Sequence, residues 1–329
     1  MKTKIKILIW AILTSLAVIG LVYQPHKKKA IVLRIAHSLD NTHPLHKSLE
    51  FFAKQVETTS HEQIKVYIYP NSQLGSDRET IEQLQSGVIP MSVCSCGPLE
   101  SFIPQMQIFG VPYLFRNKEH MLKTLNSKIG DELLASGEEY GLKGLCFFDA
   151  GARSFYTKNI PIHCPEDLKG LKIRVMKTNM SIQTVKALRS SPTPIDFGEL
   201  YTALQQGVVD GAENNPPSFY TSMHYELCKF YCLDEHQRIP DMLLISSVFW
   251  SKLSKEQQQI ISNAAQKCVL FQYKLWSQKE ISALQKVQDA GVKVIEPDKR
   301  PFIEAVQPLW HSFHNTWTGD MITKIQAVK

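Results

Sequence analysis

Two arginines lie where a buried cation needs a partner. Arg153 follows residues 149–152 (DAGA), where two expected strands meet, and Arg174 lies inside the apolar run 171–175 (LKIRV). A guanidinium in an apolar strand is costly unless an anion pairs with it, and its planar fork matches a carboxylate in two parallel hydrogen bonds. The residues alone leave two interpretations open: a salt bridge to a nearby Asp or Glu, or a ligand that carries a carboxylate.

Other residues of reactive type form weaker patterns. His37, His43 and His46 cluster after the first expected strand, but no carboxylate or cysteine completes a metal site with them. Asp210 and Glu213 could form an acid–base pair, but no nucleophile is marked beside them. The sequence has no P-loop, glycine-rich dinucleotide motif, G-x-S-x-G elbow or H-E-x-x-H motif. We therefore expect no metal, no cofactor and no catalytic residues.

The basic residues are unevenly distributed. Of the 37 Lys and Arg, six lie in residues 1–29, which contain no Asp or Glu, and the other 31 equal the 31 Asp and Glu of residues 30–329. Nucleic-acid binding requires a concentrated basic surface, so we expect no nucleic-acid partner. Residues 7–23 are uncharged and follow three lysines, a pattern typical of export signals. We expect residues 1–29 to be a signal peptide or an N-terminal anchor, and the rest to be exported.

The seven cysteines are an odd number, so at least one has no partner within the chain. Export permits a disulfide, but the spacing assigns none. Because no paired C-x-x-C units with nearby histidines occur, we expect these residues to be small buried apolar side chains.

Segments of strand and helix periodicity alternate through the body of the chain, which predicts an α/β protein with parallel sheets covered by helices. A length of 329 residues suggests two domains at roughly 150 residues each. No flexible linker separates the halves, an arrangement that suits hinge closure on a ligand. The expected strands are 31–36, 64–69, 91–94, 142–149, 153–157, 171–175, 208–212 and 292–295; the expected helices are 43–59, 77–86, 118–137, 180–188, 198–206, 254–288 and 300–317.

Five segments resemble one known family in order and spacing. They are 69–79 (YPNSQLGSDRE), 111–115 (VPYLF), 165–175 (PEDLKGLKIRV), 192–214 (PTPIDFGELYTALQQGVVDGAEN) and the helix start at 250–259. Because of these segments and their spacing, the chain from about 31 to 318 resembles the periplasmic substrate-binding subunit of tripartite ATP-independent periplasmic (TRAP) transporters, of the C4-dicarboxylate-binding type.

The resemblance implies a two-domain periplasmic-binding-protein-like fold, with a hinge between two sheets and a ligand cleft between the lobes. We expect lobe I to comprise 31–150 plus about 240–280, and lobe II 151–239 plus about 281–329, with a long helix spanning both. The implied function is not enzymatic. It is capture of a small organic acid in the periplasm and delivery to the membrane subunits of a TRAP transporter.

The resemblance also implies roles for individual residues. Arg174 corresponds to the family's principal carboxylate clamp and Arg153 to its second arginine. Phe197 corresponds to a residue that packs on the ligand, and Asn214 to a polar ligand contact. His37 and Ser95 complete the expected set of polar contacts.

Two features limit what the sequence says about the ligand. Sialic-acid binders of the family carry Glu and Arg where Ser95 and Pro98 stand here, which argues against sialate. C4-dicarboxylates, sugar acids and keto acids all fit one arginine clamp. An exported binding protein of an ABC transporter or sensor, or an exported hydrolase, remains an alternative.

Overall fold

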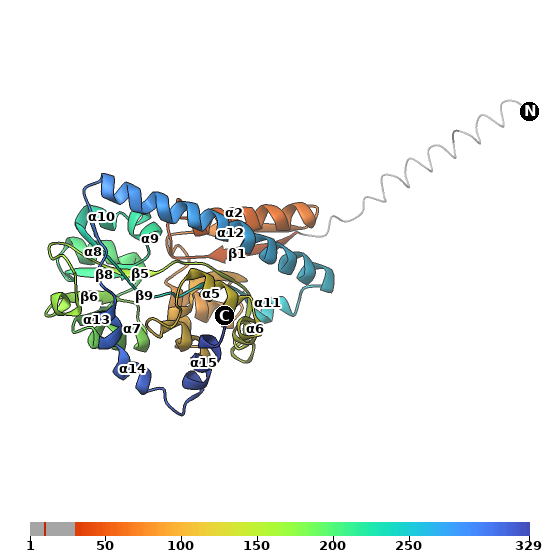
Figure 1. Ribbon diagram of the computed structural model, residues 1–329. Helices are drawn as coiled ribbons and strands as arrows, with labels where there is room; N and C mark the ends of the chain where they lie inside the picture. The colour runs from red at the N-terminus through yellow and green to blue at the C-terminus, as the bar shows by residue number, and fades with distance from the viewer. Residues whose placement is uncertain (1–9, 11–29) are drawn as a thin grey trace, which may run out of the picture. The chain divides into compact units, whose positions relative to one another are not determined.

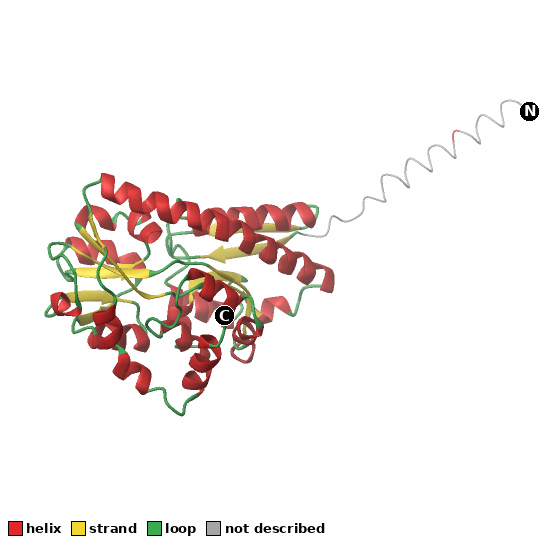
Figure 2. Cartoon of the chain, in the orientation of Figure 1, coloured by secondary structure: helices red, strands yellow, loops and turns green. Residues whose placement is uncertain are grey.

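Two β-sheets organise the part of the chain that the computed structural model describes, which is residue 10 and residues 30–329 (Figures 1 and 2). The first sheet has the order β2-β1-β3-β10-β4, and the second has the order β11-β9-β5-β8-β6-β7. The strands are β1 Ile31–Ala36, β2 Ile64–Tyr69, β3 Met91–Ser95, β4 Leu142–Phe148, β5 Arg153–Thr157, β6 Lys172–Val175, β7 Ser191–Pro194, β8 Gly211–Asn214, β9 Phe230–Gln237, β10 Asp241–Ser246 and β11 Lys293–Ile295.

Helices cover both sheets (Figure 2). The α-helices are α2 Pro44–Thr59, α3 Asp77–Gln85, α4 Cys96–Leu99, α5 Lys118–Leu125, α6 Lys128–Ala135, α7 Asn179–Ala187, α8 Leu200–Gln205, α9 Pro216–Thr221, α10 His224–Leu227, α11 Ser247–Trp250, α12 Lys255–Asp289, α13 Arg300–Ala305, α14 Gln307–His311 and α15 Trp317–Gln326. Short 3-10 turns are η1 Pro104–Gly110, η2 Glu138–Tyr140, η3 Pro165–Leu168 and η4 Phe197–Glu199.

The sheets are mixed, which corrects the expectation of parallel sheets. β10 is antiparallel to both β3 and β4, and β5 is antiparallel to both β8 and β9. The chain crosses between the sheets through residues 149–152 and 238–240, without an intervening helix. Parallel neighbours within one sheet need a long crossover connection, but a strand that arrives directly from the other sheet is free of this constraint.

The long helix α12 is a third connection between the two halves. It packs against α2 and β4 beside the first sheet and against α9 beside the second (Figure 1). Its start is fixed by a capping box in which the Ser254 hydroxyl accepts from the Gln257 backbone and the Gln257 side chain accepts from the Ser254 backbone. The spacing at Ser254 predicted this helix start.

The last helix packs beside the first sheet rather than the second. In α15, Met321, Ile322 and Ile325 join the apolar core that includes η1, and His120 hydrogen-bonds the carbonyl of Ile325. This is an observation about α15 alone, and the lobe bounds expected from the sequence, with about 281–329 in the second lobe, stay a prediction. An apolar stripe specifies that a helix must be covered, but it does not specify by which neighbour.

The expected signal peptide or anchor falls on residues 1–29, which lie outside the described residues apart from Trp10. Within residue 10 and residues 30–329, no helix combines the length and apolarity needed to cross a bilayer. That finding concerns these residues only.

All seven cysteines lie in the described range, and all are free thiols. Six are buried, and Cys164 is partly exposed. Burial raises the pKa of Cys94 and of Cys96 well above the usual range, which keeps both thiols neutral. The buried six therefore serve as small apolar side chains, as the sequence predicted.

Side-chain alternation along the strands of the second sheet determines on which of its two helix-covered faces each residue lies. Phe155 packs with α7 and α13 on one face, whereas Tyr156 packs with α8 and α9 on the other. In β6, Ile173 and Val175 belong to the first of these clusters. Because successive side chains of a strand point to opposite faces, Arg174 projects to the other side.

Candidate functional site

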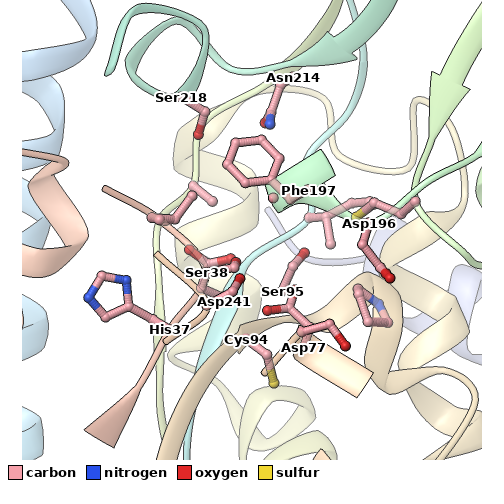
Figure 3. A pocket seen from close by; sticks show the side chains of 18 of the residues that line it. His37, Ser38, Asp77, Cys94, Ser95, Asp196, Phe197, Asn214, Ser218 and Asp241 are labelled. Carbon is pink, nitrogen blue, oxygen red and sulfur yellow. The ribbon is translucent and has the colours of Figure 1, made fainter. Parts of the chain in front are cut away.

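A cavity of about 130 Å³ brings together residues that are far apart in the sequence (Figure 3). This is below the roughly 300–1,000 Å³ of sites for drug-sized ligands, so any occupant is small. All six residues expected from the sequence line it, namely His37, Ser95, Arg153, Arg174, Phe197 and Asn214. The structure thus places them at one site, whereas their roles toward a ligand stay a prediction.

Arg174 has no acidic partner within the described part of the chain. Its side chain is 2% exposed, and its Nε donates to the carbonyl of Ile195 at 2.8 Å. Nη1 is buried and has no hydrogen-bond partner among the described residues. Burial lowers the pKa of Arg174, although an arginine stays charged at physiological pH. A buried cation with a free donor on a cavity wall is suited to bind an anion.

Phe197 lies over this guanidinium. The Cζ atom of Arg174 is 5.7 Å from the Phe197 ring centroid, which is within cation–π distance. Phe197 begins η4, and its ring also meets His224 edge-on at 5.8 Å. Burial, followed by the charge of Arg174, lowers the pKa of His224 to about 3, so this imidazole adds no charge to the site.

Arg153 already has its counter-ion. Its Nε and Nη2 donate to the two carboxylate oxygens of Glu213 at 2.5 and 2.9 Å, and Nη2 also donates to the Glu213 carbonyl. Its Nη1 donates to the side-chain oxygen of Asn214 at 3.1 Å. Antiparallel pairing of β5 with β8 places Ser154 and Phe155 opposite Asn214 and Glu213 and thereby creates this cluster. Here the salt-bridge interpretation of the sequence is correct.

A charged network supports Glu213 from behind. His236 approaches Glu213 at 3.7 Å and hydrogen-bonds Asp234 at 2.6 Å. Burial opposes the charge of His236, but Asp234 and Glu213 raise its pKa to about 9. Burial likewise opposes the charge of Glu213, but the charges of Arg153 and of the neighbouring His236 lower its pKa to about 2. Both groups are therefore ionised at neutral pH.

Asn214 is fixed by hydrogen bonds from neighbouring residues and does not cap a helix. Its side-chain oxygen accepts from Arg153 and from the Asn215 backbone, and its carbonyl accepts from the Tyr231 hydroxyl at 2.7 Å. The helix cap is the next residue, since the Asn215 side chain accepts from the Ser218 backbone at the start of α9. Asn214 also lines the cavity, and its amide nitrogen is not used in these hydrogen bonds.

The histidines form a neutral cluster. His37 Nε2 and His46 Nδ1 are 3.0 Å apart, and His43 Nε2 lies 3.2 Å from the Ser218 hydroxyl. Burial and the neighbouring His46 lower the pKa of His37 to about 3. His37 Nδ1 has no hydrogen-bond partner among the described residues. In the same part of the chain, no group of three or more His, Cys, Asp or Glu is placed to hold a metal ion.

Sequence reasoning missed two acidic residues of the cavity. Asp77, half-buried, is the first residue of α3, and Asp241, 8% exposed, is the first residue of β10. Figure 3 shows both beside Ser95 and away from Asn214. The signal was present: Asp241 opens the apolar run DMLLIS, as Arg174 interrupts its own apolar run.

Comparison with known proteins places the chain in one family. Residues 35–316 match the model of the bacterial extracellular solute-binding proteins, family 7. The uncharacterized protein YiiZ of Salmonella typhimurium is 40% identical over 286 residues, which are 86% of this chain and 87% of that protein. The C4-dicarboxylate-binding periplasmic protein DctP of Rhodobacter capsulatus is 30% identical over 81% of this chain and 80% of its own length.

The fold is also that of a solved relative. The crystal structure of a TRAP periplasmic solute-binding protein from Xanthobacter autotrophicus, with bound β-D-galacturonate, has a TM-score of 0.87 and 41% identity to this chain. The match covers 90% of this chain and all of that one. The family resemblance and the two-domain α/β fold expected from the sequence are thereby confirmed. The chain belongs to family 7 of the bacterial extracellular solute-binding proteins, the DctP-type solute-binding proteins of TRAP transporters.

Proposed function

We propose that this protein captures one small organic acid in the cavity, in the periplasm, and delivers it to the membrane subunits of a TRAP transporter. The observation that carries the proposal is Nη1 of Arg174, a buried donor on the cavity wall with no hydrogen-bond partner in the described part of the chain. A ligand carboxylate supplies the acceptor that this donor lacks. Closure of the lobes around the ligand removes water and strengthens the pair.

The other expected residues divide into two groups in this proposal. Phe197 packs over the Arg174 guanidinium and its bound carboxylate. Arg153 has four of its five N–H contacts directed at Glu213 and Asn214, so one N–H of Nη1 is left for the ligand. Arg153 thus makes at most one hydrogen bond to the ligand, and its main role is to fix the position of Asn214. His37 and Ser95 offer further polar contacts from the first sheet.

Substitution of Arg174 tests the proposal. In Arg174→Ala we expect binding of the tightest acid in a panel to weaken by ~2–5 kcal/mol, the usual loss when one side of a buried charge pair is truncated. Arg174→Lys should also bind poorly, because an ammonium cannot form the two parallel hydrogen bonds. Isothermal titration calorimetry measures both, after a thermal-shift screen of organic acids selects the ligand.

The matched control is Arg300→Ala. Arg300 is 83% exposed, pairs only with Asp298 among the described residues, and does not line the cavity. Unchanged affinity in Arg174→Ala, or an equal loss in Arg300→Ala, would remove the clamp from the proposal. Appearance of a product during the titration would favour the hydrolase alternative. Uptake by proteoliposomes that hold TRAP membrane subunits separates a TRAP partner from an ABC transporter or a sensor.

A further inference from the structure

The positive and negative charges that line the cavity are not equal in number once the ion pairs are set aside. Lys177 pairs with Asp196 at 2.6 Å, Arg78 pairs with Glu82 at 3.1 Å, and Arg153 pairs with Glu213. When these pairs are set aside, Arg174, Asp77 and Asp241 remain without an ion pair among the described residues. One cation therefore faces a cavity that also holds two carboxyl groups.

The two carboxyl groups come from different elements but lie together. Asp241 is directly opposite Ser95 in the β3–β10 ladder, and Asp77 lines the cavity with Ser38, which follows β1. We call Asp77 and Asp241 the acidic pair (Figure 3). They belong to the first sheet and its helix α3, whereas Arg174 belongs to the second sheet. The cavity is therefore cationic on one wall and acidic on the other.

Charge interactions within the cavity agree with this arrangement. Burial raises the pKa of Asp77 to about 6, although its hydrogen bond with Ser38 and the charge of Arg174 act in the opposite direction. Burial and then the charge of Asp77 raise the pKa of Asp241 to about 7. The acidic pair is thus under-compensated by the protein, and above neutral pH both members carry negative charge.

We propose that the acidic pair determines ligand class: the site accepts polyhydroxylated acids with a single carboxylate and rejects dicarboxylates. This rests on the proposed function, in which the one ligand carboxylate binds Arg174. Hydroxyl groups at the far end of the ligand donate to Asp77 and Asp241, and such hydrogen bonds to charged acceptors are strong. A second ligand carboxylate would instead meet two like charges in a dry cavity, where repulsion is large. Nη1 of Arg174, which has no partner among the described residues, is a second and independent observation that points to an anion in this cavity.

The test compares each mono-acid with the diacid that has the same carbon skeleton. The probes are galactonate with galactarate, erythronate with meso-tartrate, and galacturonate and glucuronate with galactarate and glucarate. Calorimetry at pH 8 keeps both members of the acidic pair ionised. For the tightest mono-acid we expect at least roughly 100-fold preference over its diacid, which one like-charge contact at protein-like dielectric can produce.

Two single substitutions assign the preference to the acidic pair. Asp77→Asn and Asp241→Asn keep the side-chain size and remove the charge, and each should reduce the preference to about 10-fold or less. Asp289→Asn is the control, because Asp289 is exposed at the end of α12. If one Asn variant fails to fold, the affinity ratios of the other variant and of the wild type still test the inference.

The outcomes separate this inference from the proposed function. Equal or tighter binding of a diacid by the wild type overturns the inference, as does an unchanged ratio in both Asn variants. In either case a loss of binding in Arg174→Ala leaves the proposed function standing. Binding of no acid in the panel overturns both.

Discussion

The two buried arginines of this protein stand in opposite situations. Arg153 is 6% exposed and bound on three sides by Glu213 and Asn214, with His236 and Asp234 behind. Arg174 is 2% exposed, and among the described residues it contacts the Ile195 carbonyl and the face of the Phe197 ring. The two guanidinium groups are similarly buried but differ in role: that of Arg153 stabilises the fold through its ion pair, and that of Arg174 is left to bind a ligand.

The difference teaches how to recognise a binding group within a family site. Burial and position on the cavity wall are common to both arginines, so neither feature separates them. What separates them is whether the protein supplies the counter-ion. An unpaired buried charge costs stability, and such a cost is retained where function requires it.

The sharpest way to break this comparison is to replace each arginine by methionine in the ligand-free protein. Arg153→Met leaves Glu213 buried without its main partner, so we expect a loss of ~3–5 kcal/mol in the free energy of unfolding. Arg174→Met removes an unpaired charge and should change this free energy by less than about 1 kcal/mol, or increase it. Urea unfolding measures both. Equal losses would contradict the contrast.

A double variant serves as the control for this experiment. Arg153→Met with Glu213→Leu removes both charges of the pair and should recover part of the lost stability. If it is no more stable than Arg153→Met alone, poor packing rather than the unpaired carboxylate explains the loss.

The pH dependence of stability sharpens the same comparison. The pKa of His236 is about 9 in the folded protein, above its ordinary value of 6.5, so its contribution is full below pH 6.5 and is lost as pH rises through 9. The pKa of Glu213 is about 2, below its ordinary 4.5, so its contribution is full above pH 4.5 and is lost as pH falls through 2. The network therefore stabilises most between pH 4.5 and 6.5.

His236→Gln isolates this effect. Between pH 6.5 and 9.5 we expect the wild type to lose about 2 kcal/mol more unfolding free energy than the variant, because only the wild type releases the histidine proton. Denaturant unfolding at several pH values gives the two curves. Curves that run parallel would show that His236 is not charged in the folded state.

The smallest expected effect concerns Phe197. Phe197→Leu keeps an apolar contact but removes the ring face over Arg174, and we expect ligand affinity to fall by about 0.5–1 kcal/mol. Leu227, on the short helix α10 and outside the cavity lining, offers the matched control Leu227→Ala. Calorimetry with the same acid measures both. A loss as large as that of Arg174→Ala would mean that Phe197 holds the guanidinium in place rather than adding a weak contact.

Much of the local structure followed from the sequence. The cap at Ser254 predicted the start of α12, which runs from Lys255 to Asp289. The alternation Ile173-Arg174-Val175 predicted a strand with a charged residue between two apolar ones. The family segments contain Arg174, Phe197 and Asn214, three of the six expected residues that line the cavity. These features depend on neighbours within a few residues, where hydrogen-bond geometry and side-chain period act directly.

The sequence by itself determined the α/β class, the family and which side chains stand in apolar surroundings. It could not decide which of those side chains are paired, because Arg153 and Glu213 are 60 positions apart and meet only through the β5–β8 ladder. The same holds for Asp77 and Asp241, which the fold of the first sheet brings together. Charge pairing depends on distances across strands, and those distances exist only once the sheets have formed.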